Sequence, residues 1–470
     1  MSKLYIFGIG GTGARVIRSL TMLLASGVRI EADEVVPIIV DVDLTNGNTV
    51  QSEETLKWYQ KIRSRVQPES EFFTTPMRTI GQITGADPTA MFRFSFDSTH
   101  QKKFRDFIDY SKLSAEDQFM VNLLYSEEYL DDELTEGFKG KPNMGSVALN
   151  TLTSMDEYDQ FVNSFQPGDR IFVVSSIFGG TGAAGFPILL KNFCSQKSDP
   201  KLQKALKGAL TVMPYFGVQA DNESQIDSNT FHAKTKAALA YYEKNLSGLH
   251  HLYYLADTIK ELYPNFEGST GQRNKAHVIE VLGALAIIDF ARQTFETSGA
   301  KTLCHEFALK EDGEVLTFTN LPDPAQALIK APLIRFLYLY YIMQFLLRSE
   351  RKDAWIKNIF GTASALNDED AKLLQKFLYM YADWITELAE NKRAFEPFYM
   401  QQFAESFAHA LVKGYQLEPG GLFRTGLDDN FIISALGSNS RQLPATLTTM
   451  GKLIKAGYAA TDAVIQRFYK

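Results

Sequence analysis

Cysteine is nearly absent from this sequence, and its scarcity excludes a disulfide-stapled fold. Cys194 and Cys304 are the two cysteines among 470 residues, and such a chain suits a reducing compartment. The first residues, MSKLYIFGIGG, lack the basic segment, long apolar stretch and cleavage site of a secretory signal. We therefore expect a cytoplasmic protein.

Long apolar runs and an excess of positive charge are also missing. The apolar segment at residues 333–347 carries Arg335 and Gln344 and is shorter than the roughly 20 apolar residues that a membrane-spanning helix needs. We expect it to form a buried helix, with no membrane span. The chain has 48 basic and 55 acidic side chains, which argues against nucleic acid as the main partner because phosphate backbones are bound by concentrated Lys and Arg.

The first half of the chain alternates between strand-like and helix-like segments. Short apolar runs rich in β-branched residues predict strands at residues 4–10, 35–43, 169–177, 208–216 and 251–257. Helical patterns lie between them at residues 14–27, 186–194 and 231–245. Strands separated by helices indicate an α/β fold with a parallel sheet and crossover connections.

Two other regions have a different character. Residues 46–140 are polar, charged and rich in aromatic residues, which favours an inserted, largely helical region. After residue 295 a short strand-like piece at 313–321 precedes mostly helical sequence, including a helix that we expect Asn367 to cap. The length exceeds that of one ordinary core, so we predict an α/β domain at 1–295 with an insertion at 46–140, and a mainly α-helical C-terminal domain at 296–470.

A glycine-rich motif, GIGGTG at residues 8–13, joins the first predicted strand to the first helix. Glycines allow a tight turn and let backbone N–H groups approach an anion, and the helix N-terminus adds a favourable dipole. A carboxylate after the next strand, Asp41 or Asp43, could reach a ribose or a hydrated Mg²⁺ ion. The motif alone fits a nicotinamide or flavin dinucleotide equally well, and it also fits a tight turn that binds nothing.

A second motif, FGGTGAAG at residues 178–185, again follows an apolar strand and opens a helix. Gly179, Gly180 and Gly182 free the backbone, and Thr181 offers a hydroxyl group to a phosphate oxygen. A dinucleotide fold needs one such motif. Two of them suggest a triphosphate that is held from both sides.

On these two motifs the chain resembles the tubulin/FtsZ superfamily of GTP-binding proteins, especially its divergent bacterial tubulin-like members. The superfamily signature reads GGGTG, then Ser or Thr, then Gly. Here Phe178 takes the place of the first glycine, Ala183 that of the Ser or Thr, and Ala184 that of the last glycine. GIGGTGARVI is similar to FtsZ's GVGGGGGNAV, with Arg15 at the position of an asparagine.

Four further segments resemble the family in the same order along the chain. They are VDVD at 40–43, GKPNMGSVA at 140–148, TVMPYFGV at 211–218 and RNKAHVIEVLGAL at 273–285. The resemblance, which covers about residues 1–50 and 140–292, implies a tubulin/FtsZ-type fold that binds GTP or GDP, with Mg²⁺ held through the nucleotide. It implies the following binding residues: Gly10, Gly11, Thr12, Gly13, Asp41, Asp43, Gly145, Gly179, Gly180, Thr181, Gly182, Ala183 and Asn274.

The resemblance fails where the family keeps its hydrolytic acid. FtsZ carries NVDFADV in a loop after the central helix, whereas this chain reads DFARQTFETSG, with Asp289 and Glu296 as the nearby acids. We therefore assign no catalytic residue. Three functions stay open: a self-associating GTP-binding protein that is also a GTPase, a non-catalytic nucleotide-gated scaffold for partner proteins, and a dinucleotide-dependent oxidoreductase.

Overall fold

A computed structural model of the chain describes residues 2–85, 92–94, 96, 102–138, 140–195, 199–219, 230–264, 270–295, 301–306, 308–310, 313–347, 353–362, 364–400, 408–417 and 426–469. Within these ranges, no helix is long and apolar enough to cross a membrane. The apolar segment at 333–347 forms the end of helix α14 (Asp323–Tyr341) and a π-helical turn at Ile342–Leu346, and most of its side chains are buried. The prediction of a buried helix is therefore confirmed.

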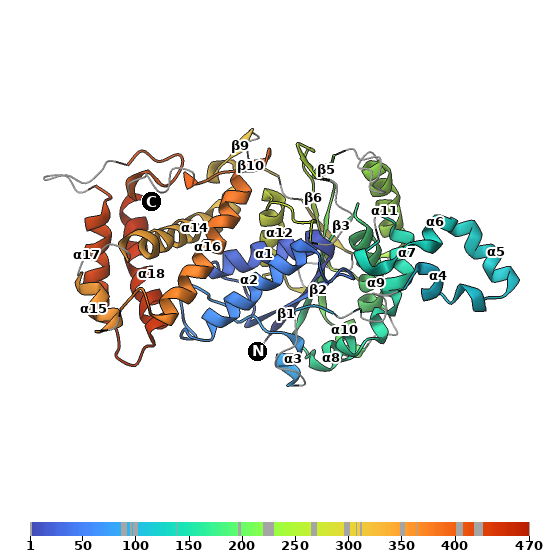
Figure 1. The fold of residues 1–470 in the computed structure, drawn as a ribbon, viewed down its shortest axis with the longest axis horizontal. Coiled ribbons are helices and arrows are strands. Elements are labelled where there is room, and N and C mark those ends of the chain that lie inside the picture. Colours follow the sequence, from blue (N-terminus) through green and yellow to red (C-terminus); the bar gives the residue numbers. More distant parts are fainter. Residues whose placement is uncertain are drawn as a thin grey trace.

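A parallel sheet lies at the centre of the molecule (Figure 1). Its six strands, as far as the chain is described, run in the order β2-β1-β3-β4-β6-β8, and every pair is parallel. Their bounds are β1 (Lys3–Ile9), β2 (Glu34–Val40), β3 (Arg170–Ser176), β4 (Leu206–Val212), β6 (His251–Leu255) and β8 (Leu303–Glu306). The first five overlap predicted strands. The sequence did not predict β8 because it is short and largely exposed.

Helices cover both faces of this sheet, which explains the continuous apolar character of its central strands. Every residue of β1 and β4 is buried. Helices α1 (Gly10–Ala25) and α12 (Val278–Phe290) lie on one face, and α9 (Gly180–Cys194), with α11 (Phe231–Asn245) beside it, lies on the other (Figure 1). The predicted α/β fold with a parallel sheet is thus confirmed.

Both glycine motifs contain the start of a helix. The sequence predicted helices from residues 14 and 186, but α1 begins at Gly10 and α9 at Gly180. Likewise the GKPNMGSVA segment at 140–148 forms most of helix α7 (Pro142–Leu149). Proline at the first position of α7 is compatible with a helix start because its missing N–H would have no partner there.

The region at 46–140 begins with a long helix, α2 (Gly47–Arg63), which packs along α1. The short helix α3 (Ile80–Thr84) follows. An arm then extends from the body of the molecule, built from α4 (Phe104–Phe107), α5 (Ala115–Leu124) and α6 (Glu127–Asp131) (Figure 1). No residue of α5 is buried.

The C-terminal part is mainly helical, as predicted, with α14, α15 (Ala354–Phe360), α16 (Glu369–Ala389), α17 (Asp429–Ser440) and α18 (Thr449–Phe468). The strand-like segment at 313–321 contributes β9 (Val315–Leu316), which pairs with β10 (Ala394–Phe395), and a 3-10 turn at Phe318–Asn320. Aromatic contacts join this part to the sheet domain, with ring centroids 5.0 Å apart for Phe73–Phe377 and 5.3 Å apart for Phe72–Phe336. One continuous core therefore underlies both parts.

The expected cap of α16 was wrong by one residue. The helix starts at Glu369, and the side chain of Asp368 accepts a hydrogen bond of 3.0 Å from the Ala371 N–H. Asn367 lies one residue further out, in a turn. A carboxylate is an equally good cap acceptor and also interacts favourably with the helix dipole.

Candidate functional site

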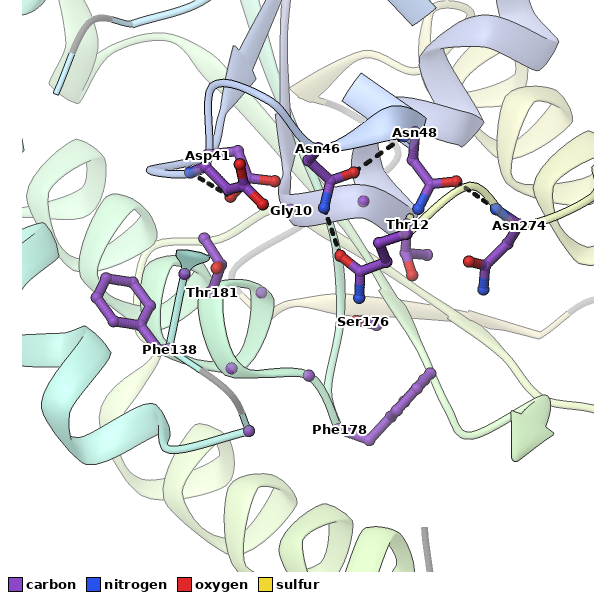
Figure 2. A pocket seen from close by; sticks show the side chains of 18 of the residues that line it. Gly10, Thr12, Asp41, Asn46, Asn48, Phe138, Ser176, Phe178, Thr181 and Asn274 are labelled. Carbon is purple, nitrogen blue, oxygen red and sulfur yellow. Dashed lines mark hydrogen bonds between the residues drawn. The ribbon is translucent and has the colours of Figure 1, made fainter. Parts of the chain in front are cut away.

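A cavity opens at the carboxyl ends of the central strands, where the first turns of α1 and α9 meet (Figure 2). Its empty space amounts to about 960 Å³, including the part open to solvent. Most of the predicted binding residues line it: Gly10, Gly11, Thr12, Asp41, Asp43, Gly179, Gly180, Thr181, Gly182 and Asn274. The structure therefore brings these residues together from four separate segments of the sequence.

The two helix N-termini face each other across the floor of the cavity. Gly10 has a φ of +66°, and a Cβ atom built on it would lie 3.5 Å from the backbone N of Gly182. The first N–H groups of a helix have no partner within the helix, and the dipole places partial positive charge there. Two such ends aimed at one space form a strong site for phosphate groups.

Close packing of helices on strands explains two of the glycines. A Cβ atom on Gly13 would lie 2.5 Å from the carbonyl carbon of Gly8, and one on Gly182 would lie 2.7 Å from the Ser175 Oγ. Neither contact is acceptable for a real side chain. Substitution of Gly182 would therefore disturb the packing of α9 on β3 as well as the approach of a phosphate group.

Three of the predicted binding residues do not line the cavity: Gly13, Gly145 and Ala183. Gly145 lies inside α7, where an added Cβ would meet the Phe138 ring at 2.7 Å and the Ala184 Cβ at 2.9 Å. Its role in this fold is to let α7 pack closely against α9. Ala183 faces a second, neighbouring cavity.

A pair of carboxylates stands at one end of the site. Asp41 and Asp43 follow β2 directly, and both are buried. An Asp43 oxygen accepts hydrogen bonds of 2.9 Å from the N–H and the hydroxyl of Thr45. For Asp41, burial and then the nearby charge of Asp43 raise the pKa of the carboxyl group to about 7.

No group of three or more His, Cys, Asp or Glu in the described part of the chain could hold a metal ion by itself. Two carboxylates fit a Mg²⁺ ion that takes its other ligands from phosphate oxygens and water, which is the usual arrangement for this ion. A bound cation would also favour the ionised form of Asp41.

Amide side chains gather at the other end of the cavity. Asn46, Asn48, Gln272 and Asn274 line it together, and they are tied to one another (Figure 2). The Asn274 N–H donates to the Asn48 Oδ1 at 2.9 Å, and the Asn46 Nδ2 donates to the Gln272 Oε1. Amides carry both donors and acceptors, as the edge of a nucleobase requires.

Sequence reasoning identified Asn274 but missed the other three amides. Asn46 and Asn48 stand at the start of α2, within the region that the sequence set apart as an insertion. The sequence signal was available in the TNGN run that follows VDVD, because it places two amides just beyond the end of a parallel strand. Phe138, Gly137 and Gly140, from the other end of the same region, also line the cavity.

Aromatic side chains form another part of the cavity wall. Phe178 packs against Phe231 and Phe216, with ring centroids 4.9 and 5.4 Å apart. All three rings line the cavity. They offer an apolar surface to a sugar or a base.

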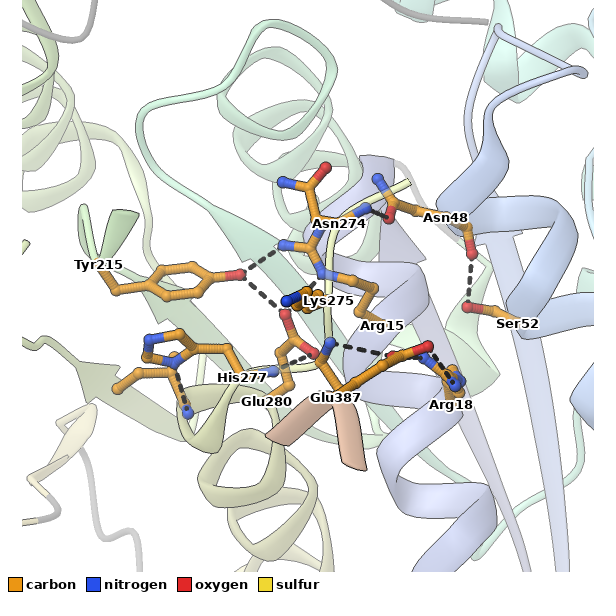
Figure 3. A network of polar contacts seen from close by, with 12 residues as sticks. Arg15, Arg18, Asn48, Ser52, Tyr215, Asn274, Lys275, His277, Glu280 and Glu387 are labelled. Carbon is orange, nitrogen blue, oxygen red and sulfur yellow. Dashed lines mark hydrogen bonds and ion pairs between the residues drawn. The ribbon is translucent and has the colours of Figure 1, made fainter. Parts of the chain in front are cut away.

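Beneath the amides, the buried Arg15 lies at the centre of a network of hydrogen bonds (Figure 3). Its Nε donates to the Glu280 Oε1 and its Nη2 to the Tyr215 hydroxyl, both at 2.6 Å. The other oxygen of Glu280 accepts from the His277 N–H at 3.1 Å. Burial, followed by the charges of Arg15 and Arg393, lowers the pKa of His277 to about 3, so this residue stays neutral and its Nδ1 accepts from the Ile279 N–H.

The acids considered for hydrolysis lie away from this cavity or outside the described residues. Asp289, on α12, accepts a hydrogen bond of 2.7 Å from the Tyr253 hydroxyl and one of 3.2 Å from the Gln293 side chain. Glu296 lies outside the described residues. The Asp289 carboxylate is therefore hydrogen-bonded to side chains of its own subunit.

Comparisons with known proteins find no matching protein-family model and no matching curated protein. Solved structures similar to the chain include CetZ from Methanosaeta thermophila strain DSM 6194 (12% identity, TM-score 0.31), an FtsZ mutant from M. jannaschii (15%, 0.25) and CetZ2 from Haloferax volcanii, a protofilament with bound GTPγS (11%, 0.30). The matches cover 61%, 54% and 62% of this chain and 52%, 46% and 58% of the other chains, respectively. These TM-scores are too low to support a function, so the function proposed below depends on the residues of the cavity.

Proposed function

We propose that this chain is a tubulin/FtsZ-like protein that binds a guanine nucleotide, GTP or GDP, together with Mg²⁺. One observation carries the proposal: the N-termini of α1 and α9 face each other across one cavity that has carboxylates at one end and amides at the other. This order of groups matches the order of metal, phosphates and base in a nucleoside triphosphate complex.

Each part of the cavity then has a role. The backbone N–H groups of Gly10, Gly11, Gly180 and Gly182 donate to phosphate oxygens, and the hydroxyl groups of Thr12 and Thr181 add to them. Asp41 and Asp43 hold the Mg²⁺ ion, which neutralises phosphate charge. The cluster of amide side chains, in particular Asn274, forms hydrogen bonds with the edge of the base.

Two opposed helix N-termini favour a triphosphate over a dinucleotide, because the pyrophosphate of a dinucleotide occupies one such end. We expect the nucleotide released from freshly purified, denatured protein to be GTP or GDP when it is identified by chromatography. Calorimetry on nucleotide-free protein should show binding of GTP in preference to NAD. If neither GTP nor ATP binds at millimolar concentration, the proposal is wrong.

The position of the base is tested by Asn274→Ala, with Lys275→Ala as the matched control. Loss of the Asn274 amide removes hydrogen bonds to the base, so GTP should bind about 10-fold more weakly, as expected for one or two hydrogen bonds. Lys275 is exposed and pairs with Glu390 at the surface, so its variant should bind GTP like the parent protein. Equal affinities of the two variants would place the base elsewhere.

Self-association with hydrolysis is the fuller form of this function. In it an acid from a neighbouring subunit would orient the attacking water, since phosphoryl transfer depends mainly on positioning and electrostatics. The engagement of Asp289 with Tyr253 favours the alternative, a non-catalytic nucleotide-gated scaffold for partner proteins. Hydrolysis whose specific rate rises with protein concentration would decide for the GTPase, and a rate at the level of buffer alone would decide for the scaffold.

A further inference from the structure

Helix α5, on the arm that extends from the body of the molecule (Figure 1), presents an apolar face to the solvent. The four large apolar side chains of this face are 54–65% exposed: Phe119, Met120, Leu123 and Leu124. Their spacing of one, three and four positions places them on one side of the helix. The Gln118 side chain, on the other side, donates hydrogen bonds to two backbone carbonyls of the arm. A contiguous apolar face of this kind marks an interaction surface.

The charges around this face restrict what can cover it. Residues 113–133, which contain α5, carry seven acidic side chains and no basic one. Glu116 is exposed on the same side of the helix, one turn before Phe119 and Met120. Two copies that paired through α5 alone would bring these acids against each other, which disfavours such a symmetric contact. The arm therefore fits a surface that is apolar at its centre and basic at its edge.

A second cavity, between α7, α9 and α11, has these properties, and we call it the α11 groove. Its empty space amounts to about 930 Å³, including the part open to solvent. Most of its wall is apolar and is formed by Pro187, Ile188, Ala237, Ala238 and Tyr241. Asn143 and Ser146 add polar groups on the α7 side. The groove is also bordered by lysines, because Lys234 lines it and the exposed Lys191 and Lys244 follow one turn after wall residues of α9 and α11.

The residues of the two surfaces have the same spacing. On α5 the face consists, in order, of Glu116, Phe119, Met120 and Leu123, and the wall residues of α11 at the same intervals are Lys234, Ala237, Ala238 and Tyr241. When the two helices lie parallel, the acid meets the lysine, and Phe119 and Met120 lie against the two alanines. Large side chains of one helix then fill the space beside small side chains of the other, as close packing requires. The groove thus complements the α5 face in charge and in size.

We propose that α5 of one copy of the chain docks into the α11 groove of a second copy. The two surfaces are different patches of the same chain, so the contact is heterologous. A helix of ten residues is about 15 Å long, so the interface is small and the association is weak. This contact extends the self-associating form of the proposed function, but it lies outside the nucleotide cavity and requires no nucleotide.

The first test is sedimentation velocity of the full-length, nucleotide-free protein. The sedimentation coefficient of the wild-type protein should rise with concentration between about 1 and about 100 µM, as expected for a weak interface. Leu123→Asp places a charge on the α5 face and should weaken association at least about 10-fold. Asn122→Asp adds the same charge off this face, where Asn122 accepts a hydrogen bond from the Tyr110 hydroxyl, and it should associate like the wild type. A wild-type protein that stays monomeric throughout, or equal association of the two variants, would overturn the proposal.

The second test shows which surfaces meet. Ala237→Trp places a bulky ring in the α11 groove and should abolish self-association, whereas Ala240→Trp, at an exposed position outside the cavity wall, should not. A mixture of Leu123→Asp, whose groove is intact, and Ala237→Trp, whose arm is intact, should form a one-to-one complex that grows no further. Both substituted positions are exposed, so the melting temperatures should match that of the wild type.

Two other contacts would give a different result. If α5 pairs with α5 of a second copy, or binds another surface of that copy, Ala237→Trp still self-associates and the proposal is wrong. A mixture of the two variants that stays monomeric contradicts it as well. Because no nucleotide is present, these results do not depend on the proposed GTP binding.

Discussion

At the scale of single residues, burial decides what each charged group at the site can do. Arg15 is buried, but Glu280 and Tyr215 receive its hydrogen bonds, so its charge is compensated. Asp41 is equally buried, and its main neighbour, Asp43, has the same sign of charge. The carboxylate pair therefore stores electrostatic repulsion that a cation or a proton relieves.

This repulsion predicts how the stability of the protein changes with pH. The pKa of Asp41 is about 7 in the folded chain and about 4 in the unfolded chain, so the folded state binds more protons between these values. The free energy of unfolding should fall as pH rises from about 4 to 7, and Asp41→Asn should flatten this dependence. Urea unfolding across this pH range measures it.

Two controls accompany the Asp41 measurement. Glu31→Gln removes an exposed carboxylate and should leave the pH dependence as it is. At pH 8, Mg²⁺ should raise the free energy of unfolding of the wild-type protein by more than it raises that of the Asp41→Asn variant, since ligand binding to the folded state adds to stability. An Asp41→Asn variant with the wild-type pH profile would contradict the assigned pKa.

At the scale of elements, helix ends explain where sequence and structure differ most. The starts of α1 and α9 extend into the glycine motifs because the first N–H groups of a helix need no partner within it. Helix α5, in contrast to α1 and α9, leaves large apolar side chains uncovered: its residues Phe119 and Leu123 are about two-thirds exposed (64% and 65%). Its capping Ser114 and its acidic first turn stabilise the helix locally.

The cap of α16 gives a test at this scale. Asp368→Ala removes the side-chain acceptor for the Ala371 N–H, and it should lower the free energy of unfolding by about 1 kcal/mol. Asn367→Ala, one residue earlier, should cost less than about 0.5 kcal/mol, as for other surface positions. Chemical denaturation of the two variants measures the difference, and the reverse order would restore Asn367 as the cap.

At the scale of the whole molecule, Glu387 joins the helical C-terminal part to the end of the cavity that is lined by amide side chains (Figure 3). From α16 it accepts hydrogen bonds from the Arg18 guanidinium at 2.6 Å, from the Ala276 N–H at 3.1 Å and from the Gln51 side chain at 3.2 Å. These donors belong to α1, α2 and the segment that follows Asn274. The position of α16 is thus linked to the position of the predicted base-binding loop.

Glu387→Gln tests this link. Loss of the charge weakens the hydrogen bond from the buried Arg18, so the free energy of unfolding should fall by about 1–3 kcal/mol, and GTP affinity should fall with it. Glu390→Gln, at an exposed position near the end of the same helix, removes a surface ion pair with Lys275 and should change neither quantity. Thermal melts and calorimetry give the two readouts, and a stability loss without any change in affinity would show that the link is structural alone.

The sequence determined the fold class and most of the glycine residues that line one end of the cavity. Buried parallel strands need continuous apolar runs, and tight helix starts at strand ends need glycine, so both leave local patterns that one sequence displays. The same holds for Asp41 and Asp43, which directly follow a predicted strand.

Tertiary structure alone decided the rest. Nothing local in the TNGN run shows that Asn48 meets Asn274, and nothing local in Arg15 shows that it meets Glu280, because these contacts join residues separated by 226 and 265 positions, respectively. The same applies to Gly145 and Ala183, since the packing of α7 on α9, and not their own sequence motifs, keeps them out of the wall of the cavity between α1 and α9. Strand β8 also depends on its neighbour, because a short, exposed edge strand is specified by the sheet that it joins and not by its own apolar pattern.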